Sequence, residues 1–136
     1  MSGDMEQLVE EFLSAPPFAV VGASNNLHKF GAQVFQAYLE HGLEAYPINP
    51  GQSEVQGHKA YPCLADIPVK INGVSIITPP EVTAQVIEDA AKVGIHRLWL
   101  QPGSESPALI RRAEELGHQV ISGGPCVLVA LRLHTF

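Results

Sequence analysis

Short apolar runs alternate along this chain with longer segments whose apolar residues recur at helical spacing. The first run has no polar alternation, which is typical of a strand covered on both faces of a sheet. The runs predict five strands, at residues 18–21, 44–50, 74–77, 97–100 and 119–121. The helical spacing predicts three helices between them, at residues 30–41, 80–93 and 105–116, each followed by a glycine that suits a helix end.

The two ends of the chain and its polar segments add further elements. Apolar residues at helical spacing predict an amphipathic helix over residues 4–14, which Asp4 can cap and which covers one edge of the sheet. Residues 51–59 are polar and predict a loop, and residues 62–67 predict one short helical turn. Residues 127–136 are mostly apolar and suit a short strand or an extended tail.

Strands that alternate with helices form parallel sheets with right-handed crossovers. We therefore expect an α/β fold of three layers, α/β/α, built on a Rossmann-like, doubly wound, five-stranded parallel sheet with an extra N-terminal helix. The expected strand order is 3-2-1-4-5, which places the third strand outside the second. The length of 136 residues suits one domain over residues 1–136.

Composition and charge exclude several classes of partner. The formal net charge is -6 and no lysine or arginine cluster breaks this balance, so no nucleic acid partner is expected. No apolar run approaches the roughly 18 residues of a membrane span, and the acidic residues 1–11 do not resemble a secretory signal. Cys63 and Cys126 form no disulfide framework, so a cytoplasmic, reducing location is expected.

Small and turn-forming residues gather where the predicted strands end. They are Gly22, Ala23 and Ser24, then Asn49 and Pro50, Thr78 and Pro79, Gln101 and Pro102, and finally Gly124 with Cys126. The carboxyl ends of parallel strands share one edge of the sheet, where such folds bind ligands. Turn chemistry alone also places glycine and proline there, and we prefer the site interpretation because all five ends carry such groups. At the first end a glycine turn leads into a helix, an arrangement that binds phosphate.

The first turn does not fit the usual dinucleotide cofactors. Their fingerprint reads G-x-G-x-x-G and is followed by an acid that holds the ribose diol. Here no glycine follows Gly22 until Gly31, and the second strand ends in Asn49 and Pro50 rather than in an acid. The sequence also contains no G-x-x-x-x-G-K-[ST] loop, no metal-ligand spacing and no nucleophile elbow. It therefore predicts a phosphate-bearing ligand and no catalytic set.

In their order and spacing, these segments resemble the small stand-alone CoA-binding proteins of bacteria and archaea. The resemblance covers about residues 17–126 and is carried by segments 20–24, 46–50, 61–64, 78–80, 98–103 and 124–126. That family is similar to the CoA-binding domain of the succinyl-CoA synthetase alpha subunit. The resemblance implies coenzyme A as the ligand, with contacts from Gly22, Ala23, Ser24, Asn25, Gln52, Thr78, Pro79, Leu100, Gln101 and Pro102.

Two features separate this chain from the synthetases. Gln52 stands where they carry a lysine, which removes one charge contact with the ligand. Their phosphorylated histidine lies in a later domain to which nothing in this sequence corresponds, so the ligase reaction is not expected of this chain.

Three further groups depend on their own chemistry. Lys29, with His28, is the positive group nearest the first turn and suits the ligand's phosphates; a solvated lysine at a helix start is the alternative. Lys59 and His58 suit a 3′-phosphate or a plain surface role. Cys126 suits thiol–disulfide exchange with the CoA thiol, and an inert buried cysteine is the alternative.

The function that these residues favour is binding of CoA or an acyl-CoA without catalysis by the chain on its own. One alternative is an NAD(P)-linked enzyme on the same fold. Another is a CoA-binding subunit of a larger acyl-CoA synthetase-like assembly, so that both a homodimer and a partner enzyme chain remain open. The sequence does not define the acyl group.

Overall fold

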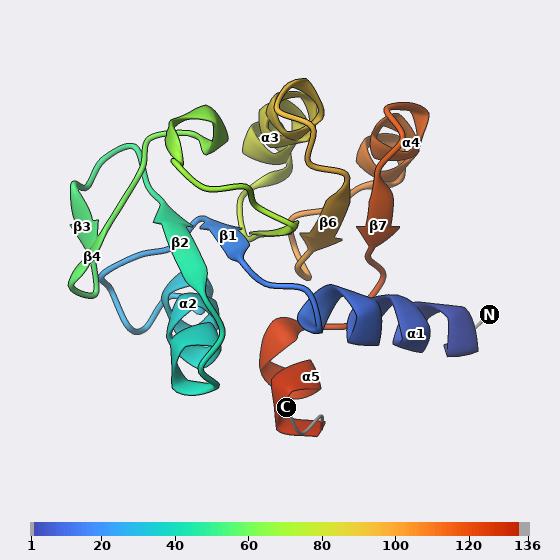
Figure 1. The fold of residues 1–136 in the computed structure, drawn as a ribbon. Coiled ribbons are helices and arrows are strands. Elements are labelled where there is room, and N and C mark those ends of the chain that lie inside the picture. The colour runs from blue at the N-terminus through green and yellow to red at the C-terminus, as the bar shows by residue number, and fades with distance from the viewer. Residues whose placement is uncertain (1, 134–136) are drawn as a thin grey trace.

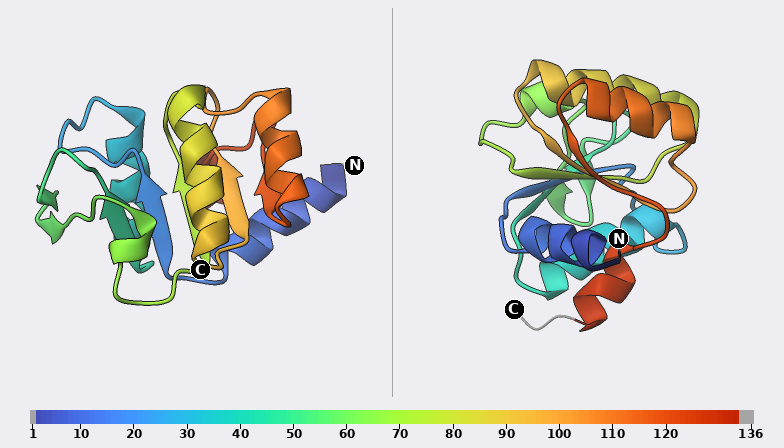
Figure 2. Two further views of the ribbon diagram at one scale, coloured as in Figure 1. Left: turned by 90° about the horizontal axis from the view of Figure 1, so that it is seen from above. Right: turned by 90° about the vertical axis from the view of Figure 1, so that its right-hand side faces the viewer.

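The computed structural model describes residues 2–133, which fold into three layers (Figure 1). The middle layer is a parallel sheet of β1 (Phe18–Val21), β2 (Ala45–Ile48), β5 (Gly73–Ile76), β6 (Arg97–Leu100) and β7 (Gln119–Ile121). One outer layer holds α3 (Pro80–Lys92) and α4 (Pro107–Glu115). The other holds α1 (Ser2–Leu13), α2 (Phe30–Glu40) and α5 (Val127–Leu133), as Figure 2 shows. The expected Rossmann-like α/β/α fold with an N-terminal helix is confirmed.

The strand order differs from the expected 3-2-1-4-5. The observed order, β2-β1-β5-β6-β7, places the third strand of the sheet beside β1 instead of outside β2. Pro47 accounts for the difference. Its carbonyl accepts a hydrogen bond from the N–H of Tyr61 at 3.0 Å, on the edge of β2 that faces away from β1. Its ring nitrogen faces that edge too and has no hydrogen to donate, so β2 is confined to the edge of the sheet.

The segment expected to be a polar loop contains a small hairpin. β3 (Glu54–Val55) pairs antiparallel with β4 (His58–Lys59) at one end of the molecule (Figure 1). Val55 is fully buried in the core, so this otherwise polar segment is attached to the core by one apolar side chain. The short helical turn expected over residues 62–67 is present as η1 (Leu64–Asp66).

The C-terminal segment forms a helix, and the expectation of a strand or tail is wrong for residues 127–133. Residues 134–136 lie outside the described residues. Val127, Ala130 and Leu131 recur at helical spacing, and all three are buried in the core beneath α2. Packing of this one face stabilises a helix whose branched residues have only modest helix propensity.

The N-terminal helix contributes to the core of the sheet's α2 face and does more than cover an edge. The Phe12 ring lies 5.1 Å from the ring of Phe18 on β1 and 5.3 Å from that of Trp99 on β6. Gly73 on β5 leaves room for it, because a Cβ there would lie 2.6 Å from the Phe12 ring. Phe18 in turn stacks on Tyr38 of α2 at 4.8 Å. These rings join α1 and α2 to the central strands.

A buried histidine lies at the edge of the sheet where the strands begin, directly before β7. His118 is 5% exposed, its Nε2 lies 3.0 Å from the carbonyl of Ile87, and its Nδ1 has no hydrogen-bond partner among residues 2–133. Burial lowers the pKa of His118 below the ordinary 6.5, and the neighbouring His96 lowers it further. The Ile87 carbonyl and Glu88 oppose this shift without cancelling it.

Replacing Leu131 by alanine should lower the free energy of unfolding by about 2–5 kcal/mol, because buried side-chain atoms are lost and a cavity remains. In the same helix, Val129 is 50% exposed. Val129→Ala should therefore change the free energy of unfolding by less than about 0.5 kcal/mol. Urea denaturation measures both, and equal effects would show that α5 does not pack on the sheet as described.

His118 should make the protein less stable as the pH falls from about 7 toward 5. The unfolded histidine, with a pKa of about 6.5, binds a proton in this range more readily than the folded one, so protonation favours unfolding. His118→Gln should reduce this slope, measured by urea denaturation across the pH range, with the exposed His28→Gln variant as control. A slope unchanged in His118→Gln would assign the pH dependence to other groups.

Candidate functional site

A pocket of about 210 Å³ opens at the carboxyl edge of the sheet, where β1, β2 and β5 end and α3 begins. Its lining combines the glycine turn that follows β1 (residues 22–24, called the first turn below), the end of β2 and the start of α3. The residues are Val21, Gly22, Ala23, Ser24, Lys29, Ile48, Asn49, Pro50, Thr78 and Val82. Half of the sequence-predicted site residues therefore meet in one place, although they come from separate parts of the chain.

At Gly22 the first turn approaches its neighbours backbone to backbone. Gly22 has a φ of 98°, and a Cβ there would lie 2.0 Å from the carbonyl oxygen of Ile77. A Cβ on Gly31, in the first turn of α2, would lie 2.0 Å from the carbonyl oxygen of Gly22. Both positions therefore require glycine, and the N-terminus of α2 lies directly on the turn that follows β1.

Hydrogen-bond donors at this turn are suited to an anion. The first-turn amides of an α-helix have no partner within the helix, and its dipole favours negative charge at that end. α2 has no acidic residue in its first turn, and its N-cap, Lys29, makes no capping hydrogen bond through its side chain. The Ser24 hydroxyl accepts a hydrogen bond from the N–H of Asn26, and this bond does not use the hydroxyl's own proton.

Asn49 occupies the position where dinucleotide-binding proteins carry the ribose-binding acid. Its Nδ2 donates to the carbonyl of Ala23 at 3.0 Å, and its Oδ1 accepts from the N–H of Gly51 at 2.8 Å. The Nδ2 bond thus joins the first turn to the end of β2, and the Oδ1 bond fixes the turn that follows β2. Asn49 shapes the pocket and is poorly placed to hold a ribose diol.

A group of hydroxyls fixes the part of the pocket lined by Thr78, between β5 and α3. The N–H of Thr78 donates to the Ser104 hydroxyl at 2.9 Å, and the hydroxyls of Thr78 and Thr83 share a hydrogen bond of 2.8 Å. Ser104 and Thr83 are both buried. The sequence pattern does not single out these two residues; its one signal is the hydroxyl of Ser104, which follows the glycine turn after β6.

The remaining predicted residues lie around the pocket or farther along the same edge. Asn25 bonds to the β3–β4 hairpin, Gln52 is exposed beyond the turn at Asn49, and Pro79 is the N-cap of α3. Leu100 is fully buried in the core and Pro102 is exposed.

Gln101 and Cys126 belong to the far end of this edge. Gln101 is fully buried; its Oε1 accepts from the N–H of Val127 at 3.0 Å, and its Nε2 has no partner among the residues that the structure describes. Trp99 donates through Nε1 to the carbonyl of Pro125 at 2.9 Å. These contacts hold the loop that carries Cys126, a partly exposed residue whose Sγ accepts from the N–H of Val129 at 3.4 Å.

Lys59 and His58, the two other basic candidates, contact aromatic rings and do not line the pocket. The Lys59 ammonium lies 5.4 Å from the centre of the Tyr61 ring. The His58 ring meets Phe35 edge to face at 5.7 Å. Lys29 is therefore the titratable side chain among the described residues that line the pocket.

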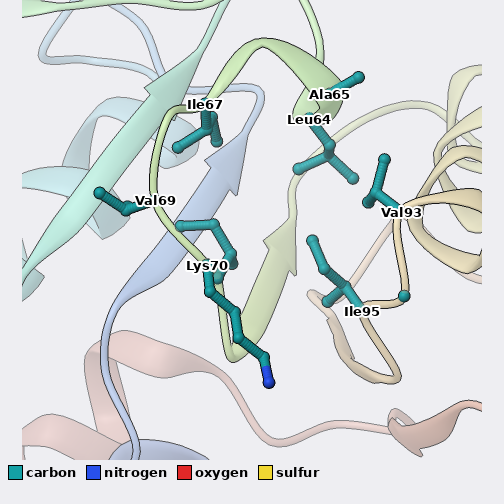
Figure 3. A pocket seen from close by; sticks show the side chains of 9 residues that line it. Leu64, Ala65, Ile67, Val69, Lys70, Val93 and Ile95 are labelled. Carbon is teal, nitrogen blue, oxygen red and sulfur yellow. The ribbon is translucent and has the colours of Figure 1, made fainter.

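A second pocket lies between η1 and the C-terminal end of α3 (Figure 3). Most of the residues that line it have apolar side chains, with Leu64, Ile67 and Ile95 around the hollow and Lys70 at its side. None of the predicted site residues lines it. Within residues 2–133 there is also no group of acidic, histidine or cysteine side chains that could hold a metal ion, and no helix long and apolar enough to cross a membrane.

An open parallel sheet with a glycine turn, a helix N-terminus and a pocket at its carboxyl edge defines a Rossmann-like ligand-binding domain. The sequence profile of the CoA binding domain matches residues 17–132. The chain belongs to this CoA-binding domain family.

Known proteins of two kinds are similar to this chain. A hypothetical protein from Pyrococcus horikoshii has 31% identity and a TM-score of 0.88, with 94% of this chain and 90% of that chain covered. The alpha subunit of the ADP-forming acetate–CoA ligase II of Pyrococcus furiosus is 28% identical over 130 residues, or 88% of this chain. The dinucleotide-forming acetyl-coenzyme A synthetase 1 of Candidatus Korarchaeum cryptofilum has 34% identity and a TM-score of 0.67, over 76% of this chain and 25% of that one. This chain spans only 28% of the length of the ligase subunit.

Gly31→Ala should lower the free energy of unfolding by about 3 kcal/mol, because the new Cβ would overlap the backbone of the first turn. Without that overlap, alanine in a helix would raise the free energy of unfolding by up to about 1 kcal/mol. Gly51→Ala is the control, since its Cβ would meet the Asn49 side chain at an ordinary 3.4 Å. Thermal and urea unfolding measure both variants, and a stabilised Gly31→Ala would refute the close contact.

Proposed function

We infer that this chain binds CoA or an acyl-CoA, with the pyrophosphate at the first turn. The observation that carries the proposal is the pocket formed where the Gly22 turn meets the N-terminus of α2. Helix amides, the Ser24 hydroxyl and Lys29 supply donors to phosphate oxygens there. Membership of the CoA-binding domain family supports this choice among phosphate-bearing ligands.

The alternative of an NAD(P)-linked enzyme is disfavoured by Asn49. Its amide is engaged with Ala23 and Gly51, and no carboxylate replaces it at the end of β2. Among the described pocket-lining residues, Lys29 is the titratable one, so the pocket offers no acid–base pair for chemistry. A binding role without catalysis by this chain on its own fits these groups.

The pantetheine arm has a route along the carboxyl edge toward Gln101, Pro102 and Cys126. From β1 the edge passes β5 and β6 to β7. Three spacings between neighbouring strands amount to roughly 14 Å, a span that an extended pantetheine can cover. At its end the Cys126 thiolate can attack CoA disulfide, forming a protein–CoA disulfide and releasing one CoA as thiolate.

A role as the CoA-binding part of a larger ligase assembly is the second candidate. It is favoured by the similarity to part of the ligase alpha subunit of Pyrococcus furiosus. A pull-down from native lysate that returns only this protein would count against it, and native mass spectrometry would distinguish a monomer from a homodimer.

Isothermal titration calorimetry with CoA tests the proposal. Wild type should bind CoA in preference to NAD⁺, and Lys29→Ala should raise the Kd for CoA about tenfold through loss of a charged phosphate contact. Lys70→Ala, which removes a lysine beside the second pocket, should leave the Kd unchanged. No heat at millimolar CoA, or tighter binding of NAD⁺, would reject the proposal.

Mass spectrometry after incubation with CoA disulfide tests the thiol step separately. Wild type should gain the mass of one CoA, and Cys126→Ser should not, whereas Cys63→Ser should behave as wild type. An adduct that persists in Cys126→Ser would place the reactive thiol elsewhere.

A further inference from the structure

Gln56 lies at the tip of the β3–β4 hairpin in a left-handed backbone conformation, with a φ of 52°. Gly57 follows with a φ of 82°, and this pair forms the two-residue turn that suits the twist of a hairpin. Asparagine and glycine adopt the first of these conformations more readily than glutamine, for which it is strained. The glutamine side chain therefore requires an explanation other than turn formation.

The explanation lies in the bonds that Gln56 makes to the first turn. Its Nε2 donates to the carbonyl of Ser24 at 3.2 Å and to that of Ala32, in α2, at 3.0 Å. Its backbone N–H donates to Asn25 Oδ1 at 2.7 Å, and Asn25 Nδ2 donates to the carbonyl of Glu54 at 2.8 Å. One residue of the hairpin thus holds both the loop after β1 and the start of α2.

The hairpin is itself held firmly. Val55 is fully buried in the core, and the His58 ring packs edge to face on Phe35 of α2. Just beyond β4, the chain joins the edge of the sheet, where Tyr61 exchanges backbone hydrogen bonds with Pro47 and Asn49. Gln56 therefore presents its amide from a fixed support and not from a free loop.

We propose that Gln56 is a positioning residue for the ligand of the first turn. It does not line the pocket; it fixes Ser24, which does, and the first turn of α2. The free chain then already holds the Ser24 hydroxyl and the helix amides in the arrangement that receives phosphate. Such preorganisation raises affinity because less freedom is lost on binding. The inference rests on the proposed function only for the identity of the ligand, CoA.

Two substitutions distinguish the effect of the Gln56 side-chain hydrogen bonds from the effect of its strained backbone φ. Gln56→Glu keeps the length of the side chain and replaces its two donating N–H groups by an acceptor oxygen. Gln56→Gly removes the side chain and relieves the strained φ. Gln119→Glu is the matched control, because it makes the same change of charge on an exposed glutamine at the start of β7. Amide hydrogen exchange without ligand, CoA titration and thermal unfolding are measured for each.

Amide exchange of residues 23–29 should become faster in both Gln56 variants, and the Kd for CoA should rise about tenfold. The melting temperature of Gln56→Gly should remain near that of wild type, because relief of strain offsets the lost hydrogen bonds. Gln119→Glu should match wild type throughout. Unchanged loop exchange, or a similar acceleration of exchange across the whole sheet, would overturn the proposal, as would an unchanged Kd.

Failure of the proposed function gives a different result. If wild type binds no CoA, the ligand is wrong, and loop exchange alone decides the role of Gln56. Faster exchange confined to residues 23–29 would then support positioning, and unchanged exchange would reject it.

Discussion

The backbone contact between Gly22, Ile77 and Gly31 is the constraint on which the candidate site depends. A Cβ at either glycine would lie 2.0 Å from a carbonyl oxygen, so β1, the end of β5 and the start of α2 meet without side chains between them. This approach brings the N-terminal amides of α2 to the end of β1. A phosphate can then be bound by backbone groups whose positions are set by the sheet itself.

The core holds α2 at the orientation that this contact requires. At the other end of the helix, Tyr38 stacks on Phe18 and its hydroxyl shares a 2.6 Å hydrogen bond with Ser75 on β5. Burial raises the pKa of Tyr38, so the hydroxyl remains neutral and the hydrogen bond persists over the ordinary pH range. α2 is thus attached to β5 through side chains at one end and to the first turn through backbone at the other. Asn49 and Gln56 complete this arrangement by hydrogen bonds to the loop between β1 and α2.

Local patterns predict the elements of this fold but not all of their neighbours. The alternation of apolar runs and helical spacing was sufficient for the sheet strands and for α2, α3 and α4. The expected order placed another strand outside the second one, whereas the missing N–H of Pro47 confines β2 to the edge of the sheet. Val127, Ala130 and Leu131 have helical spacing, but in a short, mostly apolar segment this spacing does not exclude a strand or tail; burial against the α2 face decides for the helix.

Some residues of the candidate site can likewise be predicted from the sequence, and others cannot. The first turn and the strand ends follow from topology, because parallel strands bring their carboxyl ends to one edge. Gln56, Thr83 and Ser104 act through contacts between distant segments, and single-sequence reasoning has no access to such contacts.

An acidic chain that bound a polyanion would depend on where its few donors lie, because its overall charge opposes the ligand. With a formal net charge of -6, this chain cannot attract phosphate by its overall field. Arg112 is paired with Glu88 and Glu115, and Lys59 lies over the Tyr61 ring, so neither is directed at the pocket. Of the described residues that line the pocket, Lys29 is the cationic one; the helix amides are further donors, and amides bind an anion only when they point at it. Binding of an anion at this pocket, as proposed above, would therefore depend on orientation more than on charge, and residues that position donors without touching the ligand would matter to it.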